Sequence, residues 1–153
     1  MKRREFTVII LLHVIVLLSA CNTNQQSVVK EPMKPSNPVV YFEIPVHDVE
    51  RAIEFYQAVF QFKFEKTVID HNEMALFPFV AEGTGISGAF AKGEIYKPTK
   101  EGVLIYFHTS DIDGASKLVT THGGQVLYPK TSNGELGFVA EFEDTEGNRM
   151  ALH

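Results

Sequence analysis

The sequence has little of three things on which common classes of protein depend: cysteine, net positive charge and long apolar runs. Its 153 residues include one cysteine, Cys21, so the chain cannot form an internal disulfide. Acidic residues outnumber basic residues by 19 to 14, and this balance disfavours nucleic acid as a partner. The longest apolar run, the almost unbroken residues 6–18, covers 13 residues and is too short to span a bilayer comfortably.

Signatures of nucleotide binding and of the commoner catalytic sites are also missing. Gly83, Gly85 and Gly88 are not followed by a phosphate-loop lysine and do not stand between a strand and a helix, so they predict turns. No Ser-His-Asp order and no paired metal-ligand spacing stands out in the sequence. Three histidines at expected turns or helix ends are interpreted as solvent-exposed: His47, His71 and His122.

The N-terminus contains a basic segment, residues 2–4, followed by the apolar run, an order typical of a signal peptide. The run ends in Leu-Ser-Ala-Cys at residues 18–21, which resembles the bacterial lipobox, where the cysteine thiol carries a diacylglyceryl group. The resemblance implies a signal peptide over residues 1–20 and lipidation at Cys21. It also implies a location outside the cytoplasm, on the bacterial cell membrane or an outer membrane. An uncleaved N-terminal anchor is the alternative.

Residues 21–38 are expected to form the lipidated cysteine and a flexible tether, because they are polar, have no period and end in three spaced prolines. A tether of this length reaches about 20–25 Å, enough to hold a domain off a membrane. Loss of residues 1–20 removes three basic residues and one acidic residue, so the formal charge changes from −5 to −7. We therefore expect the lipid, and not electrostatic attraction, to hold the protein at the membrane.

Residues 39–153 are enough for one domain and repeat one supersecondary unit. In the first copy, Tyr41 and Glu43 alternate with apolar neighbours in a predicted strand, and Asp48 then predicts the N-cap of an amphipathic helix. In the second copy, residues 103–108 predict the strand and Asp111 predicts the cap. The matched offsets of strand, cap and helix favour a duplication over chance.

Each copy continues with three further short strands, so the predicted order is β-α-β-β-β twice, in residues 39–95 and in residues 102–153. The predicted fold class is α+β. The additional strands are expected at residues 64–69, 74–80, 86–91, 125–128, 136–143 and 149–153.

This duplicated pattern resembles the vicinal oxygen chelate superfamily, which includes glyoxalase I, bleomycin-resistance proteins and extradiol dioxygenases. Residues 46–56, VHDVERAIEFY, are similar to the first strand-to-helix passage of that superfamily. Residues 144–149, DTEGNR, resemble its final turn, which is often D-P-x-G-N in relatives. The resemblance covers residues 39–153 and implies two βαβββ modules whose mixed sheets curl around a cleft, with the helices packed outside.

Metal-dependent members of that superfamily hold a divalent ion on the cleft faces of these strands through His, Glu or Gln. Position by position, those ligands fall on Tyr41, Leu104 and Ala151. Leucine and alanine have no donor atom, and a neutral tyrosine, with a pKa of about 10, is a poor ligand. We therefore expect no metal and no other cofactor, which disfavours glyoxalase and dioxygenase chemistry.

Strand alternation predicts which side chains face the cleft. One interpretation is a pocket for a small, partly polar molecule, and the alternative is a solvated concave surface. His108 with Glu43 or Glu141 is a candidate acid–base pair or displaced metal site. The residues predicted to bind a ligand are Tyr41, Glu43, Tyr106, His108, Arg149 and His153.

Two classes of function remain. The first is a lipid-anchored module that sequesters or senses a small molecule outside the cytoplasm. The second is an enzyme, either a metal-free lyase or isomerase that uses His108 and a glutamate, or a metalloenzyme with unusual ligands. Loss of the ligand positions favours binding. The sequence leaves the identity of the ligand and the number of subunits open, a homodimer included.

Overall fold

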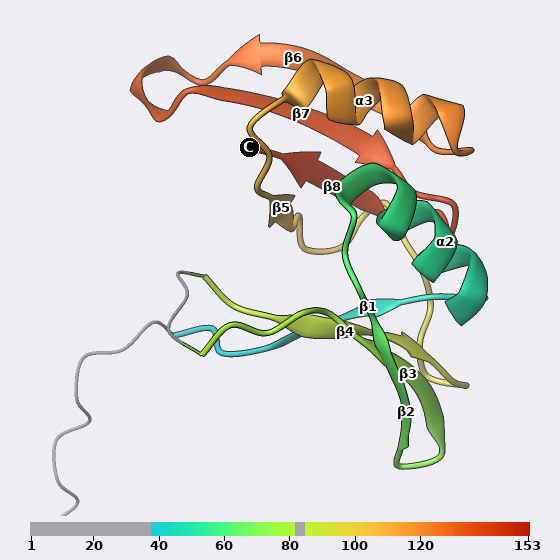
Figure 1. The fold of residues 1–153 in the computed structure, drawn as a ribbon. Helices are drawn as coiled ribbons and strands as arrows, with labels where there is room; N and C mark the ends of the chain where they lie inside the picture. The colour runs from blue at the N-terminus through green and yellow to red at the C-terminus, as the bar shows by residue number, and fades with distance from the viewer. Residues whose placement is uncertain (1–37, 82–84) are drawn as a thin grey trace, which may run out of the picture. The chain divides into compact units, whose positions relative to one another are not determined.

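The computed structural model describes residues 38–81 and 85–153 of the chain. The expected signal peptide, Cys21 and nearly all of the expected tether lie outside these residues. Within them, two α-helices and eight strands follow one another as a repeated unit (Figure 1). Neither of the helices in this part of the chain is long and apolar enough to cross a membrane.

Each module forms a four-stranded mixed sheet. The first sheet has the order β1-β4-β3-β2 and the second has the order β5-β8-β7-β6, with the first and last strands of each module parallel. This repeated order confirms the predicted α+β fold of two βαβββ modules. The elements are β1 (Phe42–Pro45), α2 (Val49–Phe60), β2 (Glu65–Ile69), β3 (Asn72–Leu76), β4 (Gly88–Lys92), β5 (Tyr106–Phe107), α3 (Ile112–Thr121), β6 (Gln125–Ser132), β7 (Phe138–Glu143) and β8 (Arg149–Leu152).

Both helices begin at the aspartates that the sequence marks as caps. The side chain of Asp48 accepts a hydrogen bond from the backbone N–H of Arg51 at 3.1 Å. The side chain of Asp111 accepts one from the N–H of Gly114 at 2.9 Å. Each carboxylate therefore satisfies a donor that has no partner inside its helix.

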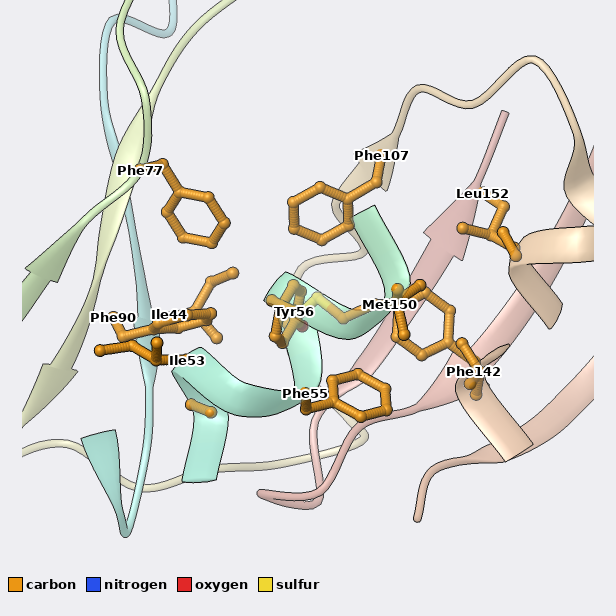
Figure 2. Close-up of a cluster of buried hydrophobic side chains, with 14 of the residues drawn as sticks. Ile44, Ile53, Phe55, Tyr56, Phe77, Phe90, Phe107, Phe142, Met150 and Leu152 are labelled. Carbon is orange, nitrogen blue, oxygen red and sulfur yellow. The ribbon is translucent and has the colours of Figure 1, made fainter. Parts of the chain in front are cut away.

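Helix α2 lies between the two sheets and contacts both. The buried ring of Tyr56 has its centroid 4.8 Å from that of Phe90 in β4 and 5.4 Å from that of Phe107 in β5. Beside the helix, Phe77, which directly follows β3, stacks on Phe107 of β5 with the ring centroids 5.9 Å apart. Figure 2 shows side chains from both sheets pointing toward α2 from opposite sides. The sequence resemblance implies that the helices pack outside the sheets. In the structure, α2 instead lies between the two sheets.

We call the sheet faces that pack around α2 and α3 the inner faces and the opposite ones the outer faces. Ile44, Phe90, Phe142 and Leu152 belong to the inner faces and are at most 1% exposed. Because neighbouring residues of a strand point to opposite faces, the residues next to these along each strand belong to the outer faces.

The predicted strands extend further than the observed ones. Val40 is 80% exposed and Val103 is 87% exposed, although alternation along the predicted strands places them on the same side as the buried Ile44 and Phe107. They precede β1 and β5, which are edge strands with one neighbour each. Strand β3 ends at Leu76, which leaves Phe79 75% exposed, and Phe138 at the start of β7 is 51% exposed.

The turn at residues 144–149 holds the two modules together. The carboxylate of Glu146, whose side chain is fully buried, accepts the N–H groups of His47 and Asp48 at 2.8 and 2.9 Å. It also accepts the Arg51 Nε–H at 2.7 Å. Glu146 therefore stabilises the start of α2 from the far end of the chain.

Asp144 and Asn148 of the same turn complete this contact. The hydroxyl of Tyr56 donates to Asp144 Oδ2 at 3.0 Å, and the side-chain amide of Asn148 donates to the carbonyl of Pro45 at 2.9 Å. The turn that resembles the final turn of the superfamily thus has a structural role, because it fixes module two on β1 and α2 of module one.

Candidate ligand-binding faces

The outer face of the first sheet carries Tyr41 and Glu43. Tyr41 is 46% exposed, and the pKa of its hydroxyl is raised by partial burial and by the negative charge of Glu43. Glu43 is exposed and pairs in register with Ala89 of β4. Its carboxylate Oε2 accepts a hydrogen bond from the hydroxyl of Tyr96 at 2.6 Å.

Tyr96 is a residue of this face that sequence reasoning missed, because it lies in a segment without strand or helix periodicity. Its ring packs on a small apolar cluster formed by Met74, Ala89 and Ala91, which is separate from the main core. The hydrogen bond to Glu43, together with burial, raises the pKa of the Tyr96 hydroxyl to about 12. The segment between the modules therefore covers part of the first sheet's outer face.

The outer face of the second sheet carries Tyr106, Glu141 and Arg149. Tyr106 is 52% exposed and pairs in register with Ala151, which in turn pairs with Glu141. The guanidinium of Arg149 binds Glu141 Oε2 through Nε at 2.8 Å and through a terminal nitrogen at 2.7 Å. Two donors of one planar group thus hold this carboxylate in place and neutralise it.

The two predicted histidines have different surroundings. His153 Nε2 lies 2.7 Å from the carbonyl oxygen of Leu136, to which its N–H donates. His108 is exposed, and within residues 38–81 and 85–153 no hydrogen bond or ion pair joins it to Glu43 or Glu141. The acid–base pair considered from the sequence is therefore not assembled within one chain.

The structure does not bring the residues of the two outer faces together. The inner faces meet around α2, so Tyr41 and Glu43 point away from the second sheet while Tyr106 and Arg149 point away from the first. Two surface hollows of about 120 and 270 Å³ are present, and neither is lined by a predicted site residue. Both hollows are smaller than the about 300–1,000 Å³ of common small-molecule pockets.

The side chains at the superfamily's metal positions do not fit an ion. Leu104 is half-buried and Ala151 is fully buried, and neither has a donor atom. The position of module one that corresponds to Ala151 is Ala89, since each pairs with the first strand of its module. In the part of the chain that the structure describes, no three His, Cys, Asp or Glu side chains form a group that could hold a metal.

Comparison with known proteins gives consistent matches. Residues 39–152 match the family model of the Glyoxalase/Bleomycin resistance protein/Dioxygenase superfamily. A glyoxylase-like domain-containing protein from Didymella fabae is 32% identical over 114 residues, which cover 72% of this chain and 88% of that protein.

Two similar solved structures share the fold at low sequence identity. A glyoxalase I mutant from Zea mays superposes with a TM-score of 0.57 at 17% identity over 79% of this chain, which spans 47% of the maize enzyme. TnmS3, described as an antibiotic binding protein from Streptomyces sp. CB03234, gives a TM-score of 0.56 at 23% identity over 80% of this chain and 98% of TnmS3.

Proposed function

Because the chain belongs to the Glyoxalase/Bleomycin resistance protein/Dioxygenase superfamily, we propose that it is a lipid-anchored, extracytoplasmic member that binds a small molecule without a metal ion. The observation that carries this proposal is the composition of the outer faces. Exposed rings of Tyr41 and Tyr106 lie on them, while Leu104 and Ala151 occupy the positions where a metal would need donors. Aromatic walls with a few oriented polar groups suit ligand binding.

A binding function is also consistent with the similarity to TnmS3, which is described as an antibiotic binding protein. A catalytic function would need an acid and a base within reach of one substrate. Glu141 is held by Arg149, and His108 contacts neither candidate glutamate in the described residues. Binding is therefore the better supported of the two classes.

We further propose that the protein binds its ligand as a homodimer. The two outer faces of one chain point in opposite directions, so a closed site requires a second copy. In such a dimer, the first sheet's outer face from one copy and the second sheet's outer face from the other enclose each ligand. Two equivalent sites then form by symmetry.

The membrane link is proposed to be the lipid on Cys21. The mature chain has a net negative charge, which does not favour electrostatic attraction to anionic lipid. Replacing Cys21 with Ser removes the thiol that accepts the lipid. The variant should remain an uncleaved precursor and should lack the acyl mass that mass spectrometry detects in the parent. A Cys21→Ser variant that is processed and partitions into detergent like the parent would contradict the anchor.

Ligand binding is tested with 2-naphthol, a neutral aromatic probe, by nuclear magnetic resonance titration. Tyr41→Ala and Tyr106→Ala should each weaken binding by about fivefold, the equivalent of one aromatic contact. Val68→Ala is the matched control, because Val68 is 68% exposed and lies on neither candidate site. Equal affinity of the parent and both tyrosine variants, or no binding at all, would contradict the proposal.

The metal-free character is tested by elemental analysis after dialysis against zinc, nickel and manganese. We expect less than stoichiometric metal, since too few donors remain to replace the hydration shell of the ion. One tightly held ion per chain that is lost on Glu43→Ala or His108→Ala would overturn this part of the proposal and favour an enzyme.

A further inference from the structure

We infer, on the basis of the proposed binding function, that the first sheet's half of the site recognises an organic cation. The recognition elements are the carboxylate of Glu43 and the rings of Tyr41 and Tyr96. A cationic ammonium group carried on an apolar or aromatic body is the ligand chemistry that this arrangement fits.

The charge of Glu43 is not neutralised by the part of the chain that the structure describes. Its carboxylate takes part in no ion pair there, and its hydrogen-bond donor is the neutral hydroxyl of Tyr96. Glu73 on the same sheet is bound by Lys92 at 3.2 Å, and Glu141 on the second sheet is bound by Arg149. Glu43 is therefore a fixed negative charge on a ligand-binding face, with Oε1 open to a donor.

Two tyrosine rings accompany this charge. Tyr41 lies two residues before Glu43, directly ahead of β1, and alternation places it on the same side of the chain. The hydroxyl of Tyr96 donates to Glu43 Oε2 at 2.6 Å, so its ring also lies beside this carboxylate. The faces of aromatic rings attract cations, and a neighbouring carboxylate adds a full charge to the attraction.

Tyr96 is held in position by packing as well as by its hydroxyl. Its ring lies against Met74, Ala89 and Ala91, of which the two alanines are 0% exposed. The small side chains on β4 leave room for the ring, and the hydrogen bond at 2.6 Å aligns the hydroxyl with Glu43. A group organised before the ligand arrives loses little conformational freedom on binding.

The second module does not repeat this arrangement. The position equivalent to Glu43 in module two is Tyr106, since both pair with the corresponding alanine of the last strand. The nearest carboxylate on that face, Glu141, is neutralised by Arg149. The preference for a cation is therefore a property of the first sheet alone.

Three probes of similar size and different charge test this inference by calorimetric titration at pH 7: benzylamine (cationic), benzyl alcohol (neutral) and benzoate (anionic). Benzylamine should bind the parent about fivefold more tightly than benzyl alcohol, and benzoate should bind more weakly than both. Glu43→Gln, which keeps an oxygen acceptor for Tyr96, should remove the advantage of benzylamine. Glu73→Gln is the control and should preserve it.

The outcomes separate this inference from the proposed function. If benzyl alcohol binds in a Tyr41-dependent manner and benzylamine has no advantage, the cation inference is wrong while the binding function stands. Benzoate binding as tightly as benzylamine, or a Glu43→Gln variant with an unchanged preference, would also overturn the inference. If none of the three probes binds at millimolar concentration, both conclusions fall.

Discussion

At the scale of single residues, Glu146 shows how a buried carboxylate can stabilise a contact between modules. It accepts two backbone N–H groups at the start of α2 and pairs with Arg51. The side chain of Glu146 is fully buried and that of Arg51 is 50% exposed, so solvent screens one side of the pair. The hydrogen bonds to the backbone therefore carry much of the stabilisation.

We expect Glu146→Gln to lower the free energy of unfolding by about 2 kcal/mol, because it removes the charge that these donors and Arg51 share. Urea unfolding followed by circular dichroism measures the change. The control is Glu73→Gln, which removes one partner of an exposed ion pair and should cost at most about 0.5 kcal/mol. Equal stability of the two variants would show that the buried carboxylate contributes no more than a surface one.

Tyr96 provides a second test at this scale, through its pKa of about 12. Subtracting the alkaline absorbance titration of Tyr96→Phe from that of the parent at 295 nm should reveal a single step near that pH. Glu43→Gln should move the step down toward the ordinary tyrosine value of about 10. A difference titration that already lies near the ordinary value in the parent would contradict the hydrogen bond.

The raised pKa also has a consequence for stability. A tyrosine whose folded pKa lies above its unfolded pKa contributes stability that is complete below the unfolded value and is lost as the pH rises through the folded value. The contribution of Tyr96 is therefore constant at neutral pH and disappears between about pH 10 and about pH 12.

The sequence predicts the candidate residues unevenly. Alternation alone places Tyr41, Glu43 and Tyr106 on the outer faces, because a two-residue period leaves one choice of side once the core side is known. It could not find Tyr96, which lies between modules in a segment with no period. The pairing of Arg149 with Glu141 depends on the register of β7 and β8, and alternation within one strand does not report how two strands are aligned.

At the scale of elements, the predictions that the structure confirms are those that depend on residues close together in the sequence. Asp48 and Asp111 each cap a helix whose first turn follows them directly, so the prediction needs no distant contact. The ends of the strands have no such local cause. Val40 and Val103 alternate correctly but extend beyond the partner strand, and a strand without a partner gains no ladder hydrogen bonds.

The parallel pairing of β1 and β4 depends on Gly88, and this leads to a prediction. A Cβ at this position would lie 2.1 Å from the carbonyl oxygen of Phe42, so Gly88→Ala must push the two strands apart. We expect a loss of about 2 kcal/mol or more in the free energy of unfolding, as for other overpacked sites. Thermal and urea unfolding of the purified variant measure it.

Gly102→Ala is the control for this substitution, because the nearest atom to its Cβ would be a methyl group of Thr99 at 3.3 Å. We expect it to change the free energy of unfolding by less than about 0.5 kcal/mol. If Gly88→Ala is no more destabilising than the control, then β1 and β4 do not approach as closely as the structure describes.

At the scale of the whole molecule, the sequence establishes which side chains share a face but not whether two faces meet. The repeated pattern correctly predicts two βαβββ modules, because the four strands of each module pair with one another in a sheet of their own. How the modules pack is decided by contacts between distant residues, such as Tyr56 with Phe90 and Phe107. No period in the sequence reports such contacts, so the sequence alone does not decide which faces of the two modules meet.

The packing of the modules leads to a prediction about subunits. If each site is built from the first sheet of one copy and the second sheet of another, Tyr41→Ala and Tyr106→Ala damage different halves of it. Each variant alone has only incomplete sites. In a mixed dimer, one site lacks both tyrosines and the other has both.

Co-expression of the two variants from equal gene copies should therefore restore 2-naphthol binding of parent affinity to about a quarter of all sites, since random pairing makes about half of the dimers mixed. A titration of the mixture should resolve this tight fraction, and each variant expressed alone should lack it. A site that lies within one chain gives no such recovery, because every chain in the mixture still lacks one tyrosine. The absence of a tight fraction in a sample whose native mass confirms mixed dimers would therefore rule out a site shared between copies.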